Sequence, residues 1–282
     1  MMEVIHPGLY SSIQDLGRYS FRNIGVPVSG VMDEFHGKLA NRLLGNDENK
    51  AVLELTLQGG SFRFHKPTQI AITGAGLSPL LNNHLVRLNS VISVTENDVL
   101  QFGKPTYGVR AYIAVKGGFQ TEEVLQSRSF YEGITQKGVI EKGDTLSYLE
   151  ETKHIHTLTH VAIRSDIFKE IAIEVYEGPE FELLTKKQQQ KLFNTEFTIG
   201  LNNRMAYQLE ETIENAIPSI ITSAVLPGTI QLTPSGKLII LMKDCQTTGG
   251  YPRILQLSDK SISVLSQKHA KNAVRFTKLS VL

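Results

Sequence analysis

The sequence has a single cysteine, no long apolar run and almost no net charge. Cys245 alone cannot form an intramolecular disulfide or a multi-cysteine zinc site, and this fits a reducing compartment, so we expect a cytoplasmic protein. No stretch reaches the ~18 consecutive apolar residues of a membrane span, and residues 1–10 lack the features of a signal peptide. With 29 Lys and Arg against 28 Asp and Glu, the composition argues against a dedicated nucleic-acid surface.

Most of the 282 residues fall into short β-branched segments separated by Gly, Asn and Asp. This pattern predicts a mainly β protein, because a doubly wound sheet would need a helix after nearly every strand. The length allows two domains. The clearest predicted strands are Ala51–Leu57, Gln69–Thr73, Leu85–Val94, Val109–Val115, Ile171–Tyr176 and Leu238–Met242.

Two helices are predicted from apolar spacing. Over Val31–Leu44, the side chains of Phe35, Leu39 and Leu43 recur every four residues. The second helix is predicted over Glu180–Phe193, directly after a proline and with a polar face.

A polar turn followed by alternating apolar residues recurs at Glu96–Phe102, Glu141–Tyr148 and Lys271–Phe276. The recurrence indicates two related barrels, although a common hairpin accounts for it equally well. The best boundary lies between Glu150 and Ile173, where a polar stretch precedes a new strand. We therefore predict two β domains, residues 1–165 and 166–282.

Two motifs near the N-terminus place charged residues in a loop shaped by Gly and Pro. QDLGR contains Asp15 and Arg18, and SGVMD contains Ser29 and Asp33 and leads into the first predicted helix. Backbone N–H groups at such a helix start can meet an anion or a carbonyl oxygen. The structural alternative is that Asp15 pairs with Arg18 and that Ser29 or Asp33 caps the helix.

Two further clusters lie in the second half. Arg204, in a polar turn, is either a surface charge or a planar fork that grips a carboxylate. The QTTGGYP motif combines flexible glycines with amide and hydroxyl groups suited to a neutral amide; its candidate residues are Gln246, Thr248, Gly249, Gly250 and Tyr251. A hairpin with a Gly-Gly turn is the alternative. Because no Lys follows the glycines, the motif is not a phosphate-binding loop.

Two other features favour structural interpretations. Cys245 has no histidine near it in sequence to activate it, so a buried thiol is favoured over a nucleophile. His154, His156 and His160 lack a carboxylate or cysteine at ligand spacing, so a solvated strand is favoured over a metal site, and no metal is expected.

Taken together, the clusters resemble the allophanate hydrolase subunit 2 family, which includes the C subunit of bacterial 5-oxoprolinase and the carboxyltransferase part of urea carboxylase. The resemblance spans residues 4–276. Its segments are Gln14–Arg18, Gly25–Asp33, Leu39–Asn46, Leu53–Glu54, Asn203–Met205, Leu209–Glu210, Leu226–Gln231 and Gln246–Pro252. Two departures are Cys245, at a position usually basic in the family, and a shortened region over residues 101–169.

The resemblance implies two cyclophilin-like β-barrel domains with a few short helices, and a chain that works in a complex. The implied partners are a subunit 1-type barrel protein, similar to the B subunit of 5-oxoprolinase, and a third protein similar to its A subunit. The expected activity is ATP-dependent hydrolysis of 5-oxoproline to glutamate at a composite site, with ATP used through the complex. The alternatives are carboxyl transfer to urea or a related amide, which needs biotin, and non-catalytic antagonism of a histidine-kinase inhibitor.

The site roles follow as hypotheses. Arg18 or Arg204 would bind the substrate carboxylate, and Asp15 or Asp33 would accept the amide N–H. Ser29 would also contact substrate. The backbone N–H groups around Thr248, Gly249 and Gly250 would polarise the carbonyl oxygen, and Gln246 and Tyr251 would orient the substrate. These assignments name ten residues in all, the catalytic candidates being Asp15, Asp33, Gln246 and Thr248.

Overall fold

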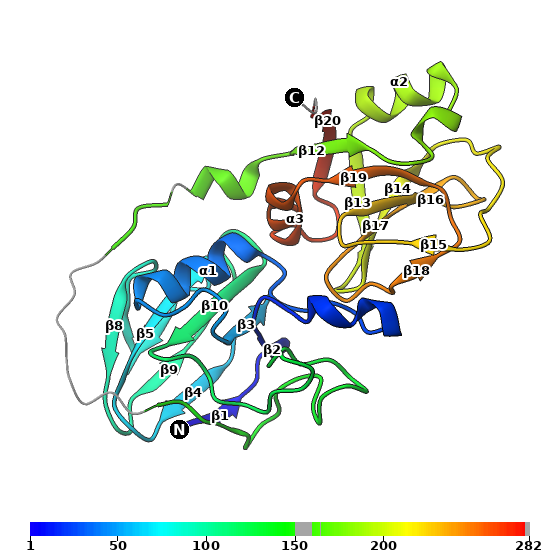
Figure 1. Cartoon of the computed structure of the whole chain (residues 1–282). Coiled ribbons are helices and arrows are strands. Elements are labelled where there is room, and N and C mark those ends of the chain that lie inside the picture. The colour runs from blue at the N-terminus through cyan, green and yellow to red at the C-terminus, as the bar shows by residue number, and fades with distance from the viewer. Residues whose placement is uncertain (150–159, 164, 280–282) are drawn as a thin grey trace. The chain divides into compact units, whose positions relative to one another are not determined.

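The chain folds into two compact units. The computed structural model describes residues 1–149, 160–163 and 165–279. The N-terminal unit comprises Met1–Arg18 and Ser29–Ser165, and the barrel unit comprises Tyr19–Val28 and Asp166–Leu282 (Figure 1).

The segment Tyr19–Val28 corrects the predicted domain ranges, which place it in the first domain. It groups with the barrel unit because it forms the short 3₁₀-helix η1 (Tyr19–Ile24), whose Arg22 donates hydrogen bonds to the barrel carbonyls of Val225 and Thr247. Part of the predicted boundary region, residues 150–159 and 164, lies outside the described residues.

The N-terminal unit contains two antiparallel sheets. One has the order β11-β1-β4-β9-β6-β7 and the other β2-β3-β10-β5-β8. The strands of the first are β1 Met2–His6, β4 Ser61–Phe64, β6 Leu80–Leu81, β7 His84–Leu85, β9 Val99–Gln101 and β11 Thr145–Leu146. Those of the second are β2 Tyr10–Gln14, β3 Val52–Thr56, β5 Thr68–Gly74, β8 Val91–Val94 and β10 Arg110–Val115.

The two sheets share one apolar core. It includes Phe62 and Phe64 from the first sheet and Leu53, Leu55 and Ile113 from the second, all fully buried. The opposite face of the second sheet is covered by helix α1 (Glu34–Leu43), which packs on β5 and β10 (Figure 1). Both faces of this sheet are therefore largely buried, and strands β2, β3, β5 and β10 carry buried residues at nearly every position.

The barrel unit is a closed seven-stranded barrel with the order β12-β19-β16-β17-β14-β13-β20. Most neighbours are antiparallel, whereas β12 and β20 are parallel. Its strands are β12 Ala172–Glu177, β13 Phe197–Asn202, β14 Ala206–Thr212, β16 Thr229–Leu232, β17 Lys237–Leu241, β19 Arg253–Leu257 and β20 Ala273–Lys278. The short pair β15 (Ser223–Ala224) and β18 (Thr248–Gly249) forms a separate two-stranded sheet.

The helices of the barrel unit have clear local signals. Helix α2 (Lys186–Asn194) begins at a capping box in which Thr185 and Gln188 bond to each other's backbone N–H groups. Helix α3 (Asp259–Ser266) is capped by Ser258. Shorter 3₁₀ turns are η2 Ser165–Lys169 and η3 Phe181–Leu183.

The prediction of a mainly β protein with a few short helices is confirmed. The strand predicted over Leu85–Val94 is wrong as a single element, because β7 ends at Leu85 and β8 begins at Val91. The helix predicted over Glu180–Phe193 is divided into η3 and α2.

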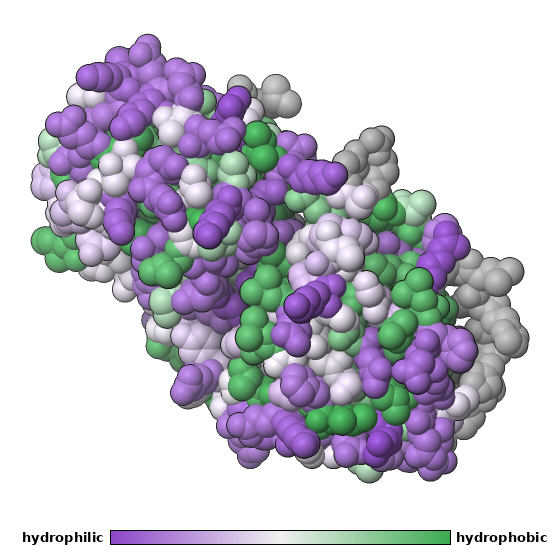
Figure 2. All heavy atoms as spheres, turned by 180° about the vertical axis from the view of Figure 1, so that it is seen from behind, coloured by the Kyte–Doolittle hydropathy of each residue, from purple (hydrophilic) through white to green (hydrophobic). Residues whose placement is uncertain are grey.

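Within the described ranges, every helix is too short or too polar to cross a bilayer. Figure 2 shows hydrophilic and hydrophobic side chains interspersed over the visible face.

Candidate functional site

The carboxylate of Asp15 accepts hydrogen bonds from its own unit, the N-terminal unit. Its Oδ1 accepts hydrogen bonds from the Gly17 N–H (2.8 Å) and from the hydroxyls of Ser127 (2.7 Å) and Ser129 (2.6 Å). Its Oδ2 accepts the Arg128 N–H at 2.6 Å. Because four donors converge on a carboxylate that is only 4% exposed, the geometry favours a structural role over the predicted contact with substrate.

Arg18 is also directed into its own unit. The side chain is buried, and Nη2 donates to the Ser129 carbonyl at 2.6 Å while Nε donates to the Val124 carbonyl at 3.4 Å. Arg18 therefore holds, together with Asp15, the segment around Ser129 against the end of β2.

The SGVMD loop is fixed by acceptors from the neighbouring sheet. Its successive backbone N–H groups donate to four acceptors: Gly30 to Gln14 Oε1 (3.0 Å), Val31 to the Asp15 carbonyl (2.9 Å), Met32 to Glu54 Oε2 (2.8 Å) and Asp33 to the Tyr112 hydroxyl (2.8 Å). The expectation that these N–H groups are free for a ligand is wrong, because the sheet already uses them.

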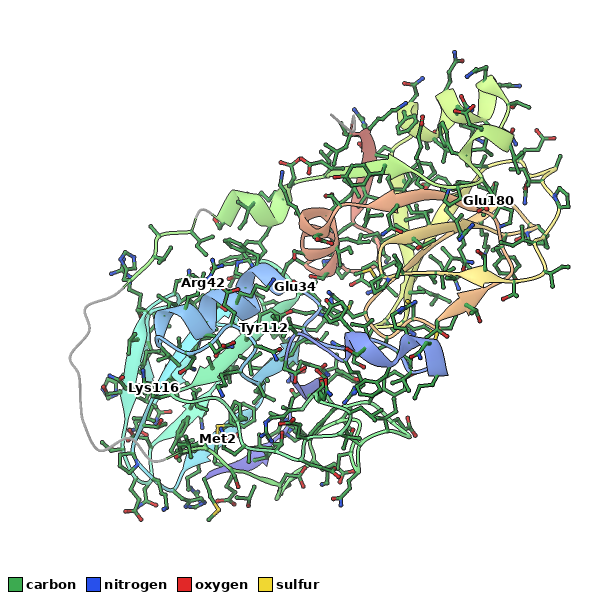
Figure 3. The ribbon with its side chains drawn as sticks, viewed as in Figure 1. Met2, Glu34, Arg42, Tyr112, Lys116 and Glu180 are labelled. Atoms are coloured by element: carbon green, nitrogen blue, oxygen red, sulfur yellow. The ribbon has the colours of Figure 1, made fainter. Side chains whose placement is uncertain are left out.

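Two of these acceptors, Glu54 and Tyr112, belong to a polar row across the second sheet. Ser12, Glu54, Tyr112 and Thr73 are cross-strand neighbours on β2, β3, β10 and β5, and all four are fully buried. They share the face that α1 covers (Figure 3 labels Tyr112 there). The row thus places a carboxylate and a phenol directly beneath the start of the helix.

The negative charge of Glu54 in this row is partly balanced by Arg110. Arg110 Nε lies 3.7 Å from Glu54 Oε1, and both side chains are at least 98% buried. Burial, followed by the negative charges of Glu54 and Asp33, raises the pKa of Tyr112 well above its ordinary value. Tyr112 is therefore a neutral phenol at physiological pH.

Asp33 and His36 form a carboxylate–imidazole pair at the start of α1. Asp33 caps the helix by accepting the His36 N–H at 3.1 Å, so the capping alternative is confirmed. Its second oxygen lies 2.6 Å from His36 Nδ1. A neutral ring that donates Nδ1–H to Asp33 presents Nε2 as its acceptor, which is the arrangement of an oriented base. His36 was not predicted as a site residue, although it stands three residues after the capping Asp33 in the sequence.

Ser29 adopts a strained backbone beside this pair. Its φ is 58°, it is fully buried, and within the described residues its hydroxyl has no hydrogen-bond partner. A left-handed non-glycine residue costs roughly 1–3 kcal/mol, and such residues cluster at ligand sites. Gly30 follows with φ 89°, where a Cβ would lie 2.8 Å from the Leu16 carbonyl carbon, so only glycine fits.

In the barrel unit, Arg204 forms a bidentate ion pair with Asp244. Its Nε and Nη2 donate to the two oxygens of Asp244 at 2.8 and 3.0 Å, and the side chain is 6% exposed. The surface-charge interpretation is wrong. The planar grip on a carboxylate exists, but the carboxylate comes from Asp244 of the same chain.

The QTTGGYP loop follows Asp244 and reaches the surface. Gln246, Thr248 and Tyr251 are exposed, whereas Gly249 packs so closely that a Cβ would lie 2.5 Å from Gln231 Nε2. Gln231 Nε2 also donates to the Tyr251 carbonyl at 3.3 Å. The loop is thus held from below and presents amide, hydroxyl and phenol groups outward. The simple hairpin alternative is wrong, because β18 pairs with β15.

Cys245 lies under this loop and is fully buried. Burial raises the pKa of its thiol to about 11, against the opposing influence of the nearby Arg22 guanidinium. The thiol is therefore protonated near neutral pH, which supports the prediction of a buried thiol over a nucleophile.

The histidine group is only partly described. His154 and His156 lie outside the described residues. His160 is exposed and lies 2.5 Å from Arg87, measured from Nε2 to Nη2. Among the residues that the structure describes, no three His, Cys, Asp or Glu side chains are placed to hold a metal ion.

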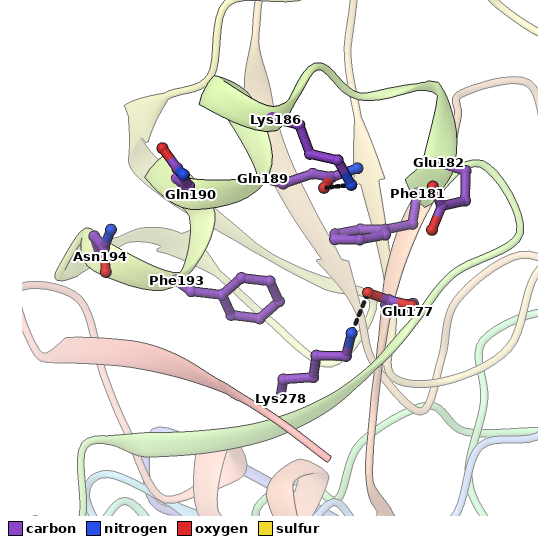
Figure 4. Close-up of a pocket in the computed structure, with 9 residues that line it drawn as sticks. All are labelled: Glu177, Phe181, Glu182, Lys186, Gln189, Gln190, Phe193, Asn194 and Lys278. Carbon is purple, nitrogen blue, oxygen red and sulfur yellow. Dashed lines mark hydrogen bonds and ion pairs between the residues drawn. The ribbon is translucent and has the colours of Figure 1, made fainter. Parts of the chain in front are cut away.

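A surface hollow of about 440 Å³ lies elsewhere on the barrel unit, between α2 and the ends of β12 and β20 (Figure 4). Phe181 and Phe193 form its apolar wall, and the ion pair of Lys278 with Glu177 closes one side. The predicted site residues are not among those that line it.

Comparisons with known proteins agree with this architecture. The family model "Carboxyltransferase domain, subdomain A and B" matches residues 24–278. The C subunit of 5-oxoprolinase from Haemophilus influenzae is 29% identical over 290 residues, which cover 100% of this chain and 92% of that protein. The urea amidolyase of Lachancea kluyveri is 41% identical over 149 residues, 51% of this chain and 8% of that protein.

A solved structure shows the same fold. The crystal structure of the K. lactis urea amidolyase superposes with a TM-score of 0.86 at 27% identity, covering 99% of this chain and 19% of that one. The predicted resemblance is confirmed, and the chain belongs to the family of carboxyltransferase domains with subdomains A and B.

Proposed function

We propose that this chain is one subunit of an ATP-dependent 5-oxoprolinase, which opens the lactam C–N bond of 5-oxoproline to give glutamate. The observation that carries the proposal is the extent of the match to the C subunit of 5-oxoprolinase. That match runs over 100% of this chain and 92% of the relative, whereas the matched part of the Lachancea urea amidolyase is 8% of a much longer protein.

The N-terminal unit carries a pair suited to proton transfer. His36, oriented by Asp33 at 2.6 Å, has the geometry of a general base. Ser29 would give its buried hydroxyl to the substrate. Asp33 is then a positioning residue and not itself the base.

The barrel unit would supply recognition of the amide. The exposed side chains of Gln246 and Tyr251 would orient the substrate, and backbone N–H groups around Thr248–Gly250 would polarise its carbonyl oxygen. The loss of one such donor typically costs about 3 kcal/mol in barrier height.

ATP would be handled outside this chain. The glycines of the QTTGGYP motif are not followed by Lys, so they do not fit a phosphate-binding loop. We therefore place nucleotide chemistry with the partners, which would be a subunit 1-type barrel protein similar to the B subunit of 5-oxoprolinase, together with a protein similar to its A subunit. No reaction step of this chain is assigned to the nucleotide.

Reconstitution tests the proposal. The purified chain alone should release no glutamate from 5-oxoproline, and the chain mixed with the products of its neighbouring genes should release glutamate only when ATP is present. A Gln246→Ala variant should lose this activity while remaining folded, because the side chain is exposed. Full activity of the isolated chain, or none in the complete set, would contradict the proposal.

A second candidate function has its own support. The Lachancea urea amidolyase is 41% identical over 149 residues, a higher local identity than that of the full-length relative. Under this alternative, the chain would transfer a carboxyl group from carboxybiotin to urea or a related amide. Transfer of labelled carboxylate to urea in the presence of a biotin carboxylase and a biotinylated carrier would favour it.

A further inference from the structure

A surface without charged residues runs beside the QTTGGYP loop of the barrel unit. Charged residues make up 20% of the chain, yet none occurs in residues 215–236, the longest stretch of the sequence that lacks them. Much of this stretch is at the surface, because among residues 215–227 only Val225 is buried. The motif itself, residues 246–252, also contains no charged residue. Residues 215–227 and 246–252 are together called the uncharged surface below.

The two parts of the uncharged surface are joined through the backbone. Strand β15 belongs to the first part and pairs with β18 of the second, outside the closed barrel (Figure 1). The Ile220 N–H donates to the Gly250 carbonyl at 3.0 Å. A Cβ on Gly250 would lie 3.6 Å from the carbonyl oxygen of Ile221. The apolar stretch therefore lies directly alongside the loop proposed to bind the amide.

Large apolar side chains of this surface face the solvent. Ile221 is fully exposed, Leu226 is 53% exposed and Tyr251 is 38% exposed. Helix η1, which is hydrogen-bonded to both parts of the surface, adds Tyr19 and Ile24, each more than half exposed. Single exposed apolar residues are ordinary in proteins, whereas a group of them that lacks charge marks a contact surface.

The charge pattern indicates what kind of molecule fits here. The charged residues that flank the motif are already paired, Asp244 with Arg204 at 2.8 Å and Arg253 with Glu180 at 2.7 Å. The uncharged surface has no Lys or Arg to offer to the phosphates of nucleic acids or anionic lipids. The cores of protein interfaces, in contrast, are apolar and depleted of charged residues. The matching partner is therefore an apolar, uncharged protein face.

The extent and position of this surface favour a whole subunit. Together with η1, it is comparable in size with the roughly 20–30 residues that each partner contributes to a standard interface. It also includes Gln246 and Tyr251, whose exposed side chains are proposed to orient the amide. A protein seated here would lie beside the bound substrate, where the second half of a composite site has to be.

We infer that the uncharged surface docks the subunit 1-type barrel protein of the proposed complex, through a face of that protein that is likewise apolar and uncharged. The inference rests on the proposed function, which makes the amide site composite. Ile221 is the anchor of this contact, because it is fully exposed and adjoins the loop at Gly250. Docking there covers the loop and excludes water from it.

The test measures association without substrate or ATP. The subunit 1-type barrel protein of the same organism is titrated into the full chain and binding is followed by calorimetry. Ile221→Asp should raise Kd at least about 30-fold, the effect of losing a hot spot, because a carboxylate would be desolvated in an apolar contact. Ile221→Leu should bind like the unmodified chain. Because Ile221 is fully exposed, neither substitution should change unfolding in urea.

Leu85→Asp is the matched control. It places the same charge at an aliphatic side chain that is 73% exposed, on β7 of the N-terminal unit, and its Kd should equal that of the unmodified chain. An unchanged Kd in Ile221→Asp would overturn the inference, as would an equal loss in Leu85→Asp. Absence of binding by the unmodified chain would overturn it as well.

Activity separates this inference from the proposed function. In the reconstituted complex, Ile221→Asp should need at least about 30-fold more partner for half-maximal glutamate release, and it should reach the full rate at saturation. Gln246→Ala should stay inactive at any concentration of partner. A complex whose assembly needs Ile221 but which releases no glutamate would contradict the proposed function alone. Normal assembly of Ile221→Asp in an active complex would overturn the docking surface alone.

Two other occupants of the surface are outcomes of parallel measurements. Sedimentation of the chain alone detects a second copy, and flotation with phosphatidylcholine vesicles detects a neutral lipid surface. Self-association or vesicle binding that Ile221→Asp abolishes, while binding of the barrel protein stays unchanged, would overturn the inference.

Discussion

The loop before α1 and the loop after β17 both combine polar residues with glycine but differ in how their polar groups are used. In the first, four successive backbone N–H groups, from Gly30 to Asp33, donate to acceptors of the adjoining sheet. In the second, Gln246 and Thr248 point their side chains to the surface.

The difference lies in what stands beneath each loop. A row of buried polar side chains that includes Glu54 and Tyr112 underlies the first loop and fixes it. The second is held mainly through Gln231 and through pairing of β18 with β15. A polar, glycine-containing motif can therefore serve as a rigid support or as a surface for ligands, and the sheet neighbours decide which.

The largest expected effect is the loss of Asp15. Asp15→Ala leaves four converging donors without their acceptor, so we expect the free energy of unfolding to fall by at least about 3 kcal/mol. Urea unfolding followed by circular dichroism measures it. Asp47→Ala is the control, because Asp47 is exposed and its carboxylate accepts, among the described contacts, only the nearby Asn49 N–H. Similar losses of unfolding free energy in both variants would show that the four hydrogen bonds to Asp15 contribute less stability than their geometry indicates.

The second-largest expected effect is the loss of the Tyr112 hydroxyl, which accepts the Asp33 N–H. Tyr112→Phe keeps the ring and removes the hydroxyl that accepts the Asp33 N–H at 2.8 Å. The free energy of unfolding should therefore fall by about 1–3 kcal/mol. The Asp33 amide should also exchange faster with solvent. Tyr176→Phe, at a residue 37% exposed, should have almost no effect. If the two variants are equally stable, the row beneath the loop does not hold it.

Elements with strong local signals could be predicted from the sequence. The helix predicted over Val31–Leu44 is α1, Glu34–Leu43, shortened at its start because Asp33 is the cap. Each recurring turn-and-strand phrase contains a strand: β9, β11 and β20. Helix α3 was missed because its serines and β-branched residues have weak helix propensity, and burial of Ile262 and Leu265 stabilises it instead.

The hydrogen-bond partners of the site residues could not be predicted from local sequence. Asp33 was identified, but its N–H acceptor Tyr112 lies 79 residues away in the chain, and the hydroxyl of Ser129 that binds Asp15 lies 114 residues away. A motif shows which polar groups are present. Only the fold shows whether another group of the chain already binds them, as Asp244 binds Arg204.

A smaller and pH-dependent effect is expected at Glu180, in the barrel unit (labelled in Figure 3). Its hydrogen bond with Arg253 lowers its pKa below the ordinary value of 4.5. A lowered pKa adds stability above about pH 4.5, and this stability is lost as the pH falls through the lower value of the folded state. Glu180→Gln should therefore cost about 1 kcal/mol at pH 7, and the difference from the unmodified protein should shrink below pH 4. A difference that does not vary with pH would contradict this role.

The smallest expected effect on stability comes from the exposed loop, and it completes the contrast with Asp15. Gln246→Ala and Thr248→Ala should each change the free energy of unfolding by less than about 0.5 kcal/mol, because both side chains are exposed. In the reconstituted complex, the same variants should nevertheless lose most of their activity, since their groups would contact the substrate. Stability is measured by urea unfolding and activity by glutamate release. Variants that stay both stable and fully active would show that this loop does not face the substrate, whereas unstable variants would make it a second support like the loop before α1.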